Sequence, residues 1–384
     1  MSQHGTWRSG PLVGVIGTRG FPNTQGGVEK HCEELYPRLA AAGMRVIVFS
    51  RSPYVAGQRT WTRWRGVLLR KLWAPRKRSF EAICHSFIAL LQAHRYRVEV
   101  LHFHAVGPGL LVPLARLLGF RVVFTHHGFD YNRGKWGRLA RLILRLGEWC
   151  AVHGAHEVLS VSQGIARSLE RRFGTKVRLA PNGVAPNEMH LADASVLTAL
   201  GARSGEYAIT VARLVPEKGW DVLFQAMQDI SRIHLLGVGG ADQESPYAKR
   251  LLANAPRRVR MLGMRPHDVT LRLVQDARVF VLPSFHEGMP IALLEALALG
   301  TLVVASDIEP HREVVKHGEN GFLFRVGDGR SLADTLLEVW DLVPERRAYV
   351  RRNAQQTVAR EYSWSRTVEI VSDAYRTVVS VTSN

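Results

Sequence analysis

The chain has 384 residues, 46% of them hydrophobic, and Lys plus Arg outnumber Asp plus Glu by 51 to 33, for a formal net charge of +18. This length and apolar content predict about two globular domains, and no window reaches the ~18 uncharged apolar residues of a membrane span. The basic excess predicts an anionic partner such as nucleic acid, lipid headgroups or a phosphate-bearing ligand. Three widely spaced cysteines fit neither a disulfide framework nor a zinc site, which favours a reduced, cytosolic protein.

Short β-branched runs alternate with helical periodicity along the chain, which is the pattern of a parallel sheet covered by helices on both faces. The first half contains expected strands at 12–17, 45–50, 66–72, 98–104, 121–126, 156–162 and 176–181. After the Pro/Asn/Gly-rich stretch PNGVAPNEMH, which reads as a linker, further strands are expected at 207–213, 232–239, 258–263, 278–284, 301–306 and 321–324.

This alternation predicts an α/β protein with two doubly wound domains in series. We place the first domain at residues 1–185 and the second at 186–360, followed by a helical segment at 361–384. In open sheets of this kind ligands bind beyond the carboxyl ends of the strands, so we expect the ligand in a cleft between the two domains.

The loop after the first strand reads GTRGFPNTQGGVEKH. Apolar positions from Val28 onward fall at helical spacing, which places Gly26 and Gly27 at a helix N-terminus. Glycines there let backbone N–H groups approach an anion, and the helix dipole adds about 0.3–1 kcal/mol for negative charge. The spacing is not GxGxxG, and an ordinary strand-to-helix turn explains these glycines as well.

The segment FTHHGFDY lies at the carboxyl end of the strand at 121–126. His126, His127 and Asp130 are therefore placed to meet a ligand, and a histidine there could bond a sugar hydroxyl or handle a proton. Solvated loop histidines are the alternative. His102 and His104 share one face of the preceding strand, and only His104 lies near its end.

Two cations, Arg213 and Lys218 in VARLVPEKGWD, lie where a strand passes into a helix. They suit a diphosphate, because Arg can bind it in a fork while Lys acts as a point charge. An Arg-x4-Lys pair is unspecific by itself, and ordinary surface charges are the alternative.

The segment PSFHEGMPIALLEALALG is strongly apolar but contains Glu287 and Glu295. Pro290 suits the first turn of a helix, which places Glu287 in the preceding loop and Glu295 inside the helix. A carboxylate on a buried helix costs several kcal/mol unless it is compensated. A ligand hydroxyl, an internal partner or solvent along one exposed stripe could compensate Glu295.

Taken in this order, the segments resemble the retaining GT-B glycosyltransferases of family 4. The resemblance rests on GTRG…GGVEKH, THHG, SVSQGI with APNGV, VARLVPEKG and EGMPIALLEALALGTLVVASDIEPHREVVKHGENGFLF. The last is the most specific, because it contains the family's Glu-x7-Glu pair as Glu287 and Glu295. HHGFDYNRGKWGRLARLILRLGEWC looks like a subgroup common among capsular and exopolysaccharide gene products. Pro290 departs from the family, since many members have a second glycine there.

The resemblance implies a GT-B fold, with two Rossmann-like domains facing across a cleft and C-terminal helices crossing back to the first domain. It also implies transfer of a hexose from a nucleotide sugar with retention of anomeric configuration. No cofactor and no metal are expected, because basic side chains and helix N-termini can neutralise the leaving diphosphate. The leaving phosphate would itself take the acceptor proton, so no side chain need be the general base.

The resemblance also assigns roles to individual residues of the second domain. Arg213 and Lys218 would neutralise the diphosphate, and Glu287 and Glu295 would bind donor-sugar and ribose hydroxyls respectively. Backbone N–H groups around the helix N-terminus, in the segment made of Gly288, Met289, Pro290 and Ile291, would add to the anion site.

In the first domain, His127 would lie beside the reacting sugar, and Gly26 with Gly27 would approach the phosphate or acceptor. Arg19, His104 and Asp130 are further candidates for acceptor binding.

The basic excess is concentrated in two segments of the first domain. Residues 59–80 carry eight Arg or Lys, with Trp61, Trp64 and Trp73 between them, and no acidic residue. A second patch runs from Arg133 to Arg145 with Trp136. Basic residues contribute on the order of 1 kcal/mol each near an anionic bilayer, and Trp favours the headgroup layer. We therefore expect peripheral docking on the cytoplasmic face of the inner membrane, to reach a polyprenyl-diphosphate-linked saccharide. A solvated basic face with Trp73 packed in the core is the alternative.

Two rival functions remain. A nucleic-acid-binding protein would explain the charge, but no segment resembles a nucleic-acid module and no nucleic-acid partner is expected. Another enzyme on the same fold, such as a nucleotide-sugar epimerase or a sugar phosphorylase, would use many of the same residues. The sequence names neither the donor base nor the sugar.

Overall fold

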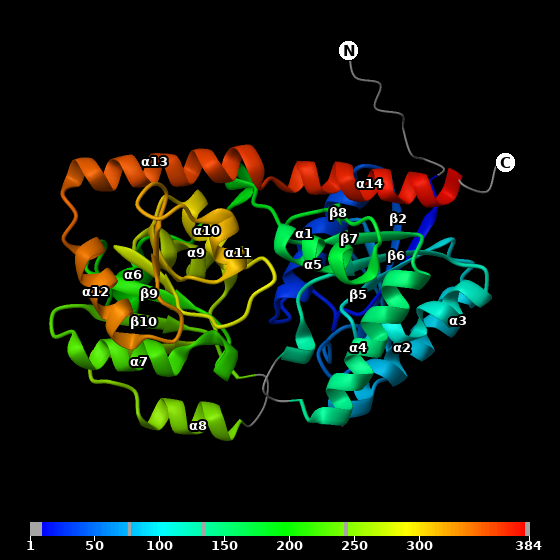
Figure 1. Cartoon of the computed structure of the whole chain (residues 1–384), viewed down its shortest axis with the longest axis horizontal. Helices are drawn as coiled ribbons and strands as arrows, with labels where there is room; N and C mark the ends of the chain where they lie inside the picture. Colours follow the sequence, from blue (N-terminus) through cyan, green and yellow to red (C-terminus); the bar gives the residue numbers. More distant parts are fainter. Residues whose placement is uncertain (1–9, 76–77, 133–135, 242–244, 381–384) are drawn as a thin grey trace, which may run out of the picture. The chain divides into compact units, whose positions relative to one another are not determined.

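The computed structural model describes residues 10–75, 78–132, 136–241 and 245–380 of the chain. It divides into two compact units. Unit 1 consists of the residues up to Asn182 together with those from Trp364 onward, and unit 2 is Gly183–Ser363. Each unit contains one twisted sheet between layers of helices (Figure 1).

The sheet of unit 1 has the strand order β3-β4-β2-β1-β5-β6-β7-β8. All neighbouring pairs are parallel except β3 with β4. The strands are β1 (Leu12–Ile16), β2 (Arg45–Arg51), β3 (Trp61–Trp64), β4 (Val67–Leu72), β5 (Val100–His104), β6 (Arg121–His126), β7 (Glu157–Ser160) and β8 (Arg178–Leu179).

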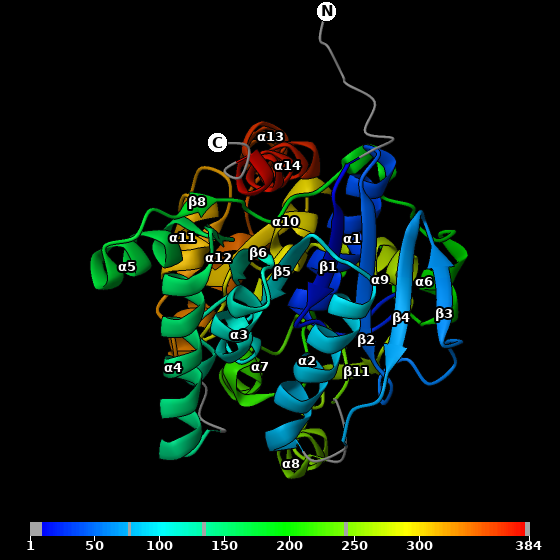
Figure 2. The ribbon, with the colours of Figure 1, turned by 90° about the vertical axis from the view of Figure 1, so that its right-hand side faces the viewer.

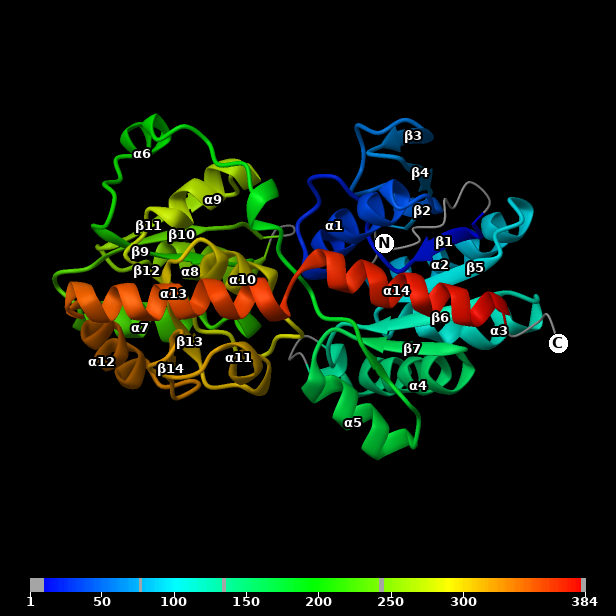
Figure 3. The same cartoon turned by 90° about the horizontal axis from the view of Figure 1, so that it is seen from above.

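The helices of unit 1 are α1 (Gly27–Ala41), α2 (Arg78–Arg95), α3 (Val112–Leu117), α4 (Arg138–Gly154), α5 (Gln163–Phe173) and α14 (Trp364–Ser380). One face of the sheet is covered by α2, α3 and α4, which lie together in Figure 2. On the other face α14 packs against α1 and crosses β5 and β6 (Figure 3). The last helix therefore completes the core of unit 1.

The sheet of unit 2 is wholly parallel, in the order β11-β10-β9-β12-β13-β14. Its strands are β9 (Tyr207–Val211), β10 (His234–Val238), β11 (Val259–Gly263), β12 (Val279–Leu282), β13 (Leu302–Ser306) and β14 (Phe322–Phe324). Every residue of β12 and β13 is buried, as expected for parallel strands with helices on both faces.

The helices of unit 2 are α6 (Ser195–Ala199), α7 (Trp220–Asp229), α8 (Pro246–Ala253), α9 (His267–Gln275), α10 (Ile291–Ala298), α11 (Glu309–Val314), α12 (Gly329–Trp340) and α13 (Pro344–Glu361). α7 packs with α12, and α10 packs with both α9 and α13. No helix among the described residues has the length and apolarity needed to cross a membrane.

In both sheets, successive strands are added first on one side of a central strand and later on its other side. In unit 1 the chain leaves β1 for β2 on one side, while β5 lies on the other side of β1. In unit 2 it leaves β9 for β10, while β12 lies on the opposite side of β9. The loops that follow β1 and β5, or β9 and β12, diverge at this central strand, the switch point of the sheet, and leave room for a ligand.

The expected α/β architecture with two doubly wound sheets is confirmed, and every predicted strand corresponds to a strand of the structure. The prediction of 176–181 was too long, since β8 has only two residues. β3 was missed because its residues, WTRW, alternate exposed and half-buried on a sheet edge and give no apolar run. Its hairpin partner β4 begins just after Arg65 and Gly66, both at positive φ.

Candidate active site

The loops that follow β9 and β12 pack directly on each other. After β9 the chain makes a 3-10 turn, Pro216–Lys218, that ends at Gly219 with φ +70°. A Cβ at Gly219 would lie 1.9 Å from the carbonyl oxygen of Pro283, at the end of β12. The Phe285 N–H donates to the Glu217 carbonyl at 2.9 Å. Only glycine permits this approach, which holds Lys218 beside the second loop.

Lys218 and Glu287 form an ion pair at this junction. The Lys218 Nζ donates to Glu287 Oε1 at 2.6 Å, and the Ser284 hydroxyl donates to the same oxygen at 2.7 Å. The two side chains are 18% and 8% exposed. Burial alone would raise the pKa of the Glu287 carboxyl, but the charge of Lys218 and a smaller contribution from His311 hold it below its ordinary value. Glu287 is therefore a carboxylate that can accept further hydrogen bonds.

Behind this pair lies a buried group that the sequence did not indicate. The Ser306 hydroxyl at the end of β13 donates to the Ser284 carbonyl at 2.5 Å, and His311 Nδ1 lies 2.8 Å from the Ser306 carbonyl. Burial lowers the pKa of His311 to about 4, so its ring is neutral and Nδ1 carries the proton. These contacts fix the loop that carries Glu287.

The segment from Gly288 to Ile291 lies at the N-terminus of α10. Pro290 is the N-cap residue, in an extended conformation (φ −75°, ψ 115°), and the helix begins at Ile291. The expected place of Pro290 inside the first turn is therefore wrong by one residue. Met289 and Ile291 are buried, while Gly288 is partly exposed. Gly288 can thus present its backbone N–H where the helix dipole favours an anion.

Glu295, one helical turn further on, already has an internal partner. His267 Nε2 lies 2.9 Å from Glu295 Oε1, and the glutamate side chain is mostly covered. Of the alternatives for Glu295, solvation along an exposed stripe is therefore wrong. His267 comes from the start of α9, and about half of its own side chain is exposed.

Arg213 lies two residues beyond β9 and is half-buried. Its carbonyl oxygen accepts from the indole N–H of the buried Trp220 at 2.9 Å. This bond ties the end of β9 to the start of α7, so the backbone that carries Arg213 is anchored to the core.

The loop after β1 is closed by a glutamate of α1. Gly26 is the N-cap of α1, and the Arg19 N–H donates to Glu29 Oε1 at 3.0 Å. A Cβ at Gly26 would lie 1.9 Å from Glu29 Oε2, whereas a Cβ at Gly27 would meet nothing within 4 Å. Glycine is needed at Gly26 because a side chain there would collide with Glu29, so no ligand has to be invoked. Gly27, in contrast, borders open space that a ligand could enter.

Arg19 itself lies over the Tyr54 ring, 4.8 Å from its centroid. The same loop packs on the end of β5, since a Cβ at Gly17 would lie 2.0 Å from the His104 carbonyl. His104 is therefore brought to the switch point of unit 1, beside the loop that leads to Gly26 and Gly27.

His127 belongs to a chain of buried hydrogen bonds. Its Nε2 lies 2.8 Å from His104 Nδ1, and His104 Nε2 lies 2.5 Å from the Tyr36 hydroxyl. That hydroxyl and the Tyr375 hydroxyl of α14 lie 3.0 and 2.6 Å from His102 Nδ1. The ring orientation of His127 thus depends on residues from two helices, α1 and α14, and one strand, β5. Tyr36 and Tyr375 were missed, since they read as ordinary apolar positions of amphipathic helices.

The electrostatics of this group favour neutral imidazoles. Burial, with smaller contributions from neighbouring histidines, lowers the pKa of His104 and of His127 well below the ordinary value. Burial also lowers the pKa of His31 to about 4, although its hydrogen bond to Asn182 opposes the shift. At neutral pH His127 can therefore offer a hydrogen bond, or accept a proton only weakly, but it does not act as a standing cation.

Among the described residues, His31, His104 and His127 form the one group whose ligand atoms could hold a metal ion, all lying within 4.8 Å of one another. His31 Nδ1 lies 2.6 Å from the side-chain oxygen Oδ1 of Asn182 and so carries a proton, while its buried Nε2 has no hydrogen-bond partner among the described residues. Zinc would need these nitrogens at about 2.0–2.1 Å from the ion. Three imidazoles are a donor set that suits zinc chemically.

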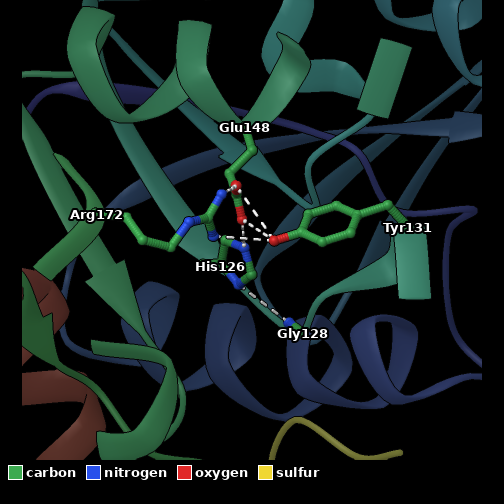
Figure 4. Close-up of polar contacts among 5 residues, drawn as sticks. All are labelled: His126, Gly128, Tyr131, Glu148 and Arg172. Carbon is green, nitrogen blue, oxygen red and sulfur yellow. Dashed lines mark hydrogen bonds and ion pairs between the residues drawn. The ribbon is translucent and has the colours of Figure 1, made fainter. Parts of the chain in front are cut away.

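His126, expected to face a ligand, does not. It is fully buried, and its Nε2 donates to Glu148 Oε1 at 3.0 Å while its Nδ1 accepts from the Gly128 N–H at 3.2 Å (Figure 4). Arg172 donates to Glu148 at 2.6 Å and to the Tyr131 hydroxyl at 2.9 Å. The side chain turns inward because an adjacent residue on a strand points to the opposite face.

This network defines the backbone next to His127. It pins Gly128, at φ +143°, and Tyr131 to α4 and α5 through Glu148 and Arg172. Asp130 begins a short 3-10 helix, and its N–H donates to the Gly128 carbonyl at 2.9 Å. Glu148 and Arg172 were not candidates, although a lone Glu in the apolar run of α4 was a usable signal.

The two basic segments differ in structure. In the first, Arg76 and Lys77 lie outside the described residues, and Trp73 is 64% exposed. The alternative that buried Trp73 in the core is therefore wrong. In the second, Arg133 lies outside the described residues, and Trp136 is half-buried.

Two family models match the chain. The model described as "Glycosyltransferase Family 4" matches residues 25–188, and "Glycosyl transferases group 1" matches 201–357. The phosphatidyl-myo-inositol mannosyltransferase of Mycobacterium leprae is 28% identical, over 96% of this chain and 97% of that protein. The UDP-Gal:alpha-D-GlcNAc-diphosphoundecaprenol alpha-1,3-galactosyltransferase of Escherichia coli is 26% identical, over 76% of this chain and 78% of that protein.

A solved structure shares the fold over almost the whole chain. Anabaena HepE, in complex with UDP-glucose, superposes with a TM-score of 0.79 at 18% identity, covering 96% of this chain and 100% of that chain. The two family matches relate one part of the chain to glycosyltransferase family 4 and the other to glycosyl transferases group 1, and the likeness to HepE shows the GT-B fold.

Proposed function

We propose that the protein transfers a hexose from a nucleotide sugar, with retention of anomeric configuration, to a lipid-linked saccharide in polysaccharide biosynthesis. The observation that carries the proposal is the Lys218–Glu287 pair at the switch point of unit 2. A cation beside a hydrogen-bonded carboxylate, next to a helix N-terminus, offers a diphosphate and a sugar the groups they need.

The donor would bind across the loops after β9 and β12. Lys218 and Arg213 would neutralise the diphosphate, and the Gly288 N–H would add a donor at the start of α10. Glu287 would accept hydrogen bonds from the hexose, and Glu295 would exchange His267 for the ribose hydroxyls. HepE, with the same fold, was solved with UDP-glucose, which supports a nucleotide-sugar donor in general rather than a particular base.

Chemistry would occur when the diphosphate leaves and its oxygen takes the acceptor proton on the same face. His127, held neutral, would donate a hydrogen bond to the sugar rather than serve as the base. No cofactor takes part, and we propose that no metal does, since charge on the leaving group is met by Lys218 and Arg213.

A lipid-linked acceptor is supported by the Escherichia coli relative, whose name specifies a diphosphoundecaprenol acceptor. The basic segments of unit 1 would hold the enzyme at the cytoplasmic face of the membrane. Gly27, Arg19 and Asp130 are the proposed contacts on the acceptor side, while the buried His104 would act through its hydrogen bond to His127.

The decisive test is product formation from defined substrates. Purified protein is first screened for thermal stabilisation by GDP-mannose, UDP-glucose, UDP-galactose, UDP-N-acetylglucosamine and dTDP-rhamnose, since a ligand at 100 times its dissociation constant adds about 2.7 kcal/mol. The stabilising donor is then incubated with polyprenyl-diphosphate saccharides. Release of nucleoside diphosphate only when acceptor is present supports the proposal.

Other outcomes identify the rivals. Conversion of the donor to an isomeric nucleotide sugar without acceptor would indicate an epimerase. Release of sugar 1-phosphate with inorganic phosphate would indicate a phosphorylase. Salt-dependent binding of short duplex DNA with no donor turnover would favour a nucleic-acid-binding protein.

A further inference from the structure

Helix α4 exposes a continuous apolar stripe. Leu139, Leu142, Leu146 and Trp149 are 71%, 65%, 51% and 51% exposed. Their spacing of three, four and three residues places all four within about 80° of one another around a helix that turns 100° per residue. Isolated exposed leucines are ordinary, but a stripe along three turns of one helix is not.

The direction of the stripe is fixed by the opposite face of α4. A Cβ at Gly147 would lie 2.3 Å from the Val106 carbonyl, so the helix is packed against the preceding segment at backbone distance. Glu148 and Ala151 are fully buried, and Glu148 is bonded to His126 and Arg172. The helix cannot rotate to cover its leucines without breaking this network, and α3 lies along the same buried side (Figure 2).

The charged side chains that α4 itself places beside the stripe have a single sign. Arg138, Arg141 and Arg145 are exposed and lie within about 60° of one another on the flank of the stripe. The one acidic residue of α4, Glu148, is 0% exposed. An apolar stripe flanked by arginines matches the boundary between acyl chains and anionic headgroups.

We propose that this face of α4 is the surface by which the protein docks on an anionic bilayer, with the leucines and Trp149 entering the headgroup boundary and the three arginines meeting lipid phosphates. The inference rests on the proposed function, because an enzyme whose acceptor is lipid-linked must reach that acceptor at the membrane. It also relocates the main contact from the tryptophans of residues 59–80 to α4.

The test measures binding of the full chain to vesicles by sedimentation, with phosphatidylglycerol–phosphatidylcholine vesicles and pure phosphatidylcholine vesicles side by side. The wild type is expected to bind the anionic vesicles, more weakly as salt increases. The triple variant Leu139→Gln/Leu142→Gln/Leu146→Gln is expected to lose about tenfold or more in partition coefficient at all salt concentrations. Arg138→Gln/Arg141→Gln/Arg145→Gln is expected to lose as much, and to lose the salt dependence too.

Matched controls are exposed apolar residues of unit 2. Leu252→Gln and Val343→Gln remove similar side chains at positions 47% and 59% exposed and are expected to bind like the wild type. Circular dichroism and the unfolding temperature show that the α4 variants are folded. Full vesicle binding by both folded α4 variants overturns the proposal.

A second copy of the chain is the other partner that could cover the apolar stripe of α4. If the leucine variant changes a dimer to a monomer in light scattering while vesicle binding is unaffected, the stripe is a protein interface and the proposal is wrong. Vesicle binding does not depend on donor turnover. Failure of transferase activity with normal, α4-dependent vesicle binding would therefore reject the proposed function and leave the docking surface standing.

Discussion

The Lys218 ammonium and the Glu287 carboxylate neutralise each other across the two loops at the switch point of unit 2, with 2.6 Å between Nζ and Oε1. A diphosphate that binds Lys218 must either share the ammonium group with the Glu287 carboxylate or displace that carboxylate from it. Glu287 would then be released toward the sugar hydroxyls as the phosphate engages Lys218. Recognition of the two parts of the donor would thus be coupled through one ion pair.

Removing either partner is expected to abolish most transfer without unfolding the protein. Lys218→Met should lower kcat by about 10²–10³-fold, as loss of one preorganised charge at a developing anion does. Glu287→Gln keeps the shape but weakens charge-assisted hydrogen bonds, which should reduce kcat/KM by about 10–100-fold. Initial rates with the stabilising donor measure both.

The exposed Lys316→Met variant is the control for charge loss and should retain wild-type rates. A double-mutant cycle between Lys218→Met and Glu287→Gln should give an interaction free energy of about 0.5–3 kcal/mol in donor binding. Wild-type rates in a folded Lys218→Met protein would reject the assignment of the phosphate site.

The close approach at Gly219 predicts a stability effect that can be isolated with a second glycine. Gly219 and Gly263 both have φ +70°, but a Cβ at Gly263 would meet nothing within 4 Å. Gly263→Ala should cost about 1–2 kcal/mol from backbone strain alone. Gly219→Ala should cost clearly more and should also weaken donor binding, because the Lys218 loop must move. Equal unfolding free energies for the two variants would show that the contact with Pro283 is not restrictive.

The buried carboxylate of Glu148 predicts a loss of stability on neutralisation. Glu148→Gln should lower the free energy of unfolding by about 1–3 kcal/mol, since it weakens the hydrogen bonds of a fully buried carboxylate, while the 39% exposed side chain of Arg172 stays partly screened by solvent. Asp373→Asn, at an exposed pair with Arg178, should cost less than about 1 kcal/mol. Denaturant unfolding measures both, and a small effect at Glu148 would mean that solvent already screens the network.

Buried neutral histidines predict that stability falls on acidification. The pKa values of His31 and His311 are about 4 in the folded protein, against 6.5 for a free histidine. Between about pH 6.5 and 4 the unfolded chain therefore binds protons that the folded protein does not bind. The contribution of these histidines to the free energy of unfolding is fully present above pH 6.5 and is lost as the pH falls from about 6.5 to 4. Each histidine should contribute about 3 kcal/mol to that fall.

Denaturant unfolding at pH 7.5 and 5 measures the part of this loss that falls above pH 5, about 2 kcal/mol for each histidine. His31→Gln and His311→Gln should each flatten the pH dependence, whereas His190→Gln, at an exposed position, should leave it unchanged. A pH dependence that is identical in all three variants would contradict the assignment.

Chelation tests the expectation that transfer needs no metal. Activity should be the same after dialysis against EDTA as before, because Lys218 and Arg213 supply the positive charge. If chelation abolishes activity and zinc restores it, the group formed by His31, His104 and His127 is the first site to examine, and His31→Gln should then prevent the restoration.

The order of the elements and a set of candidate site residues could be read from the sequence for a physical reason. Parallel strands buried on both faces need continuous apolar runs, and the groups that meet a ligand follow them directly. Lys218 and Glu287 could therefore be proposed separately from VARLVPEKG and the Glu-x7-Glu spacing. The edge strand β3 was missed, because an exposed hairpin strand has no such run.

Only the tertiary structure decided which of these side chains share a partner and which turn inward. His126 and His127 are neighbours with the same chemistry, yet one is bound to Glu148 and the other to His104. Glu287 meets Lys218 across 69 residues of chain because β9 and β12 are adjacent in the sheet. The sequence determined the kinds of groups available, since local periodicity sets strands and helices. Their pairing depended on strand order, which no local pattern encodes.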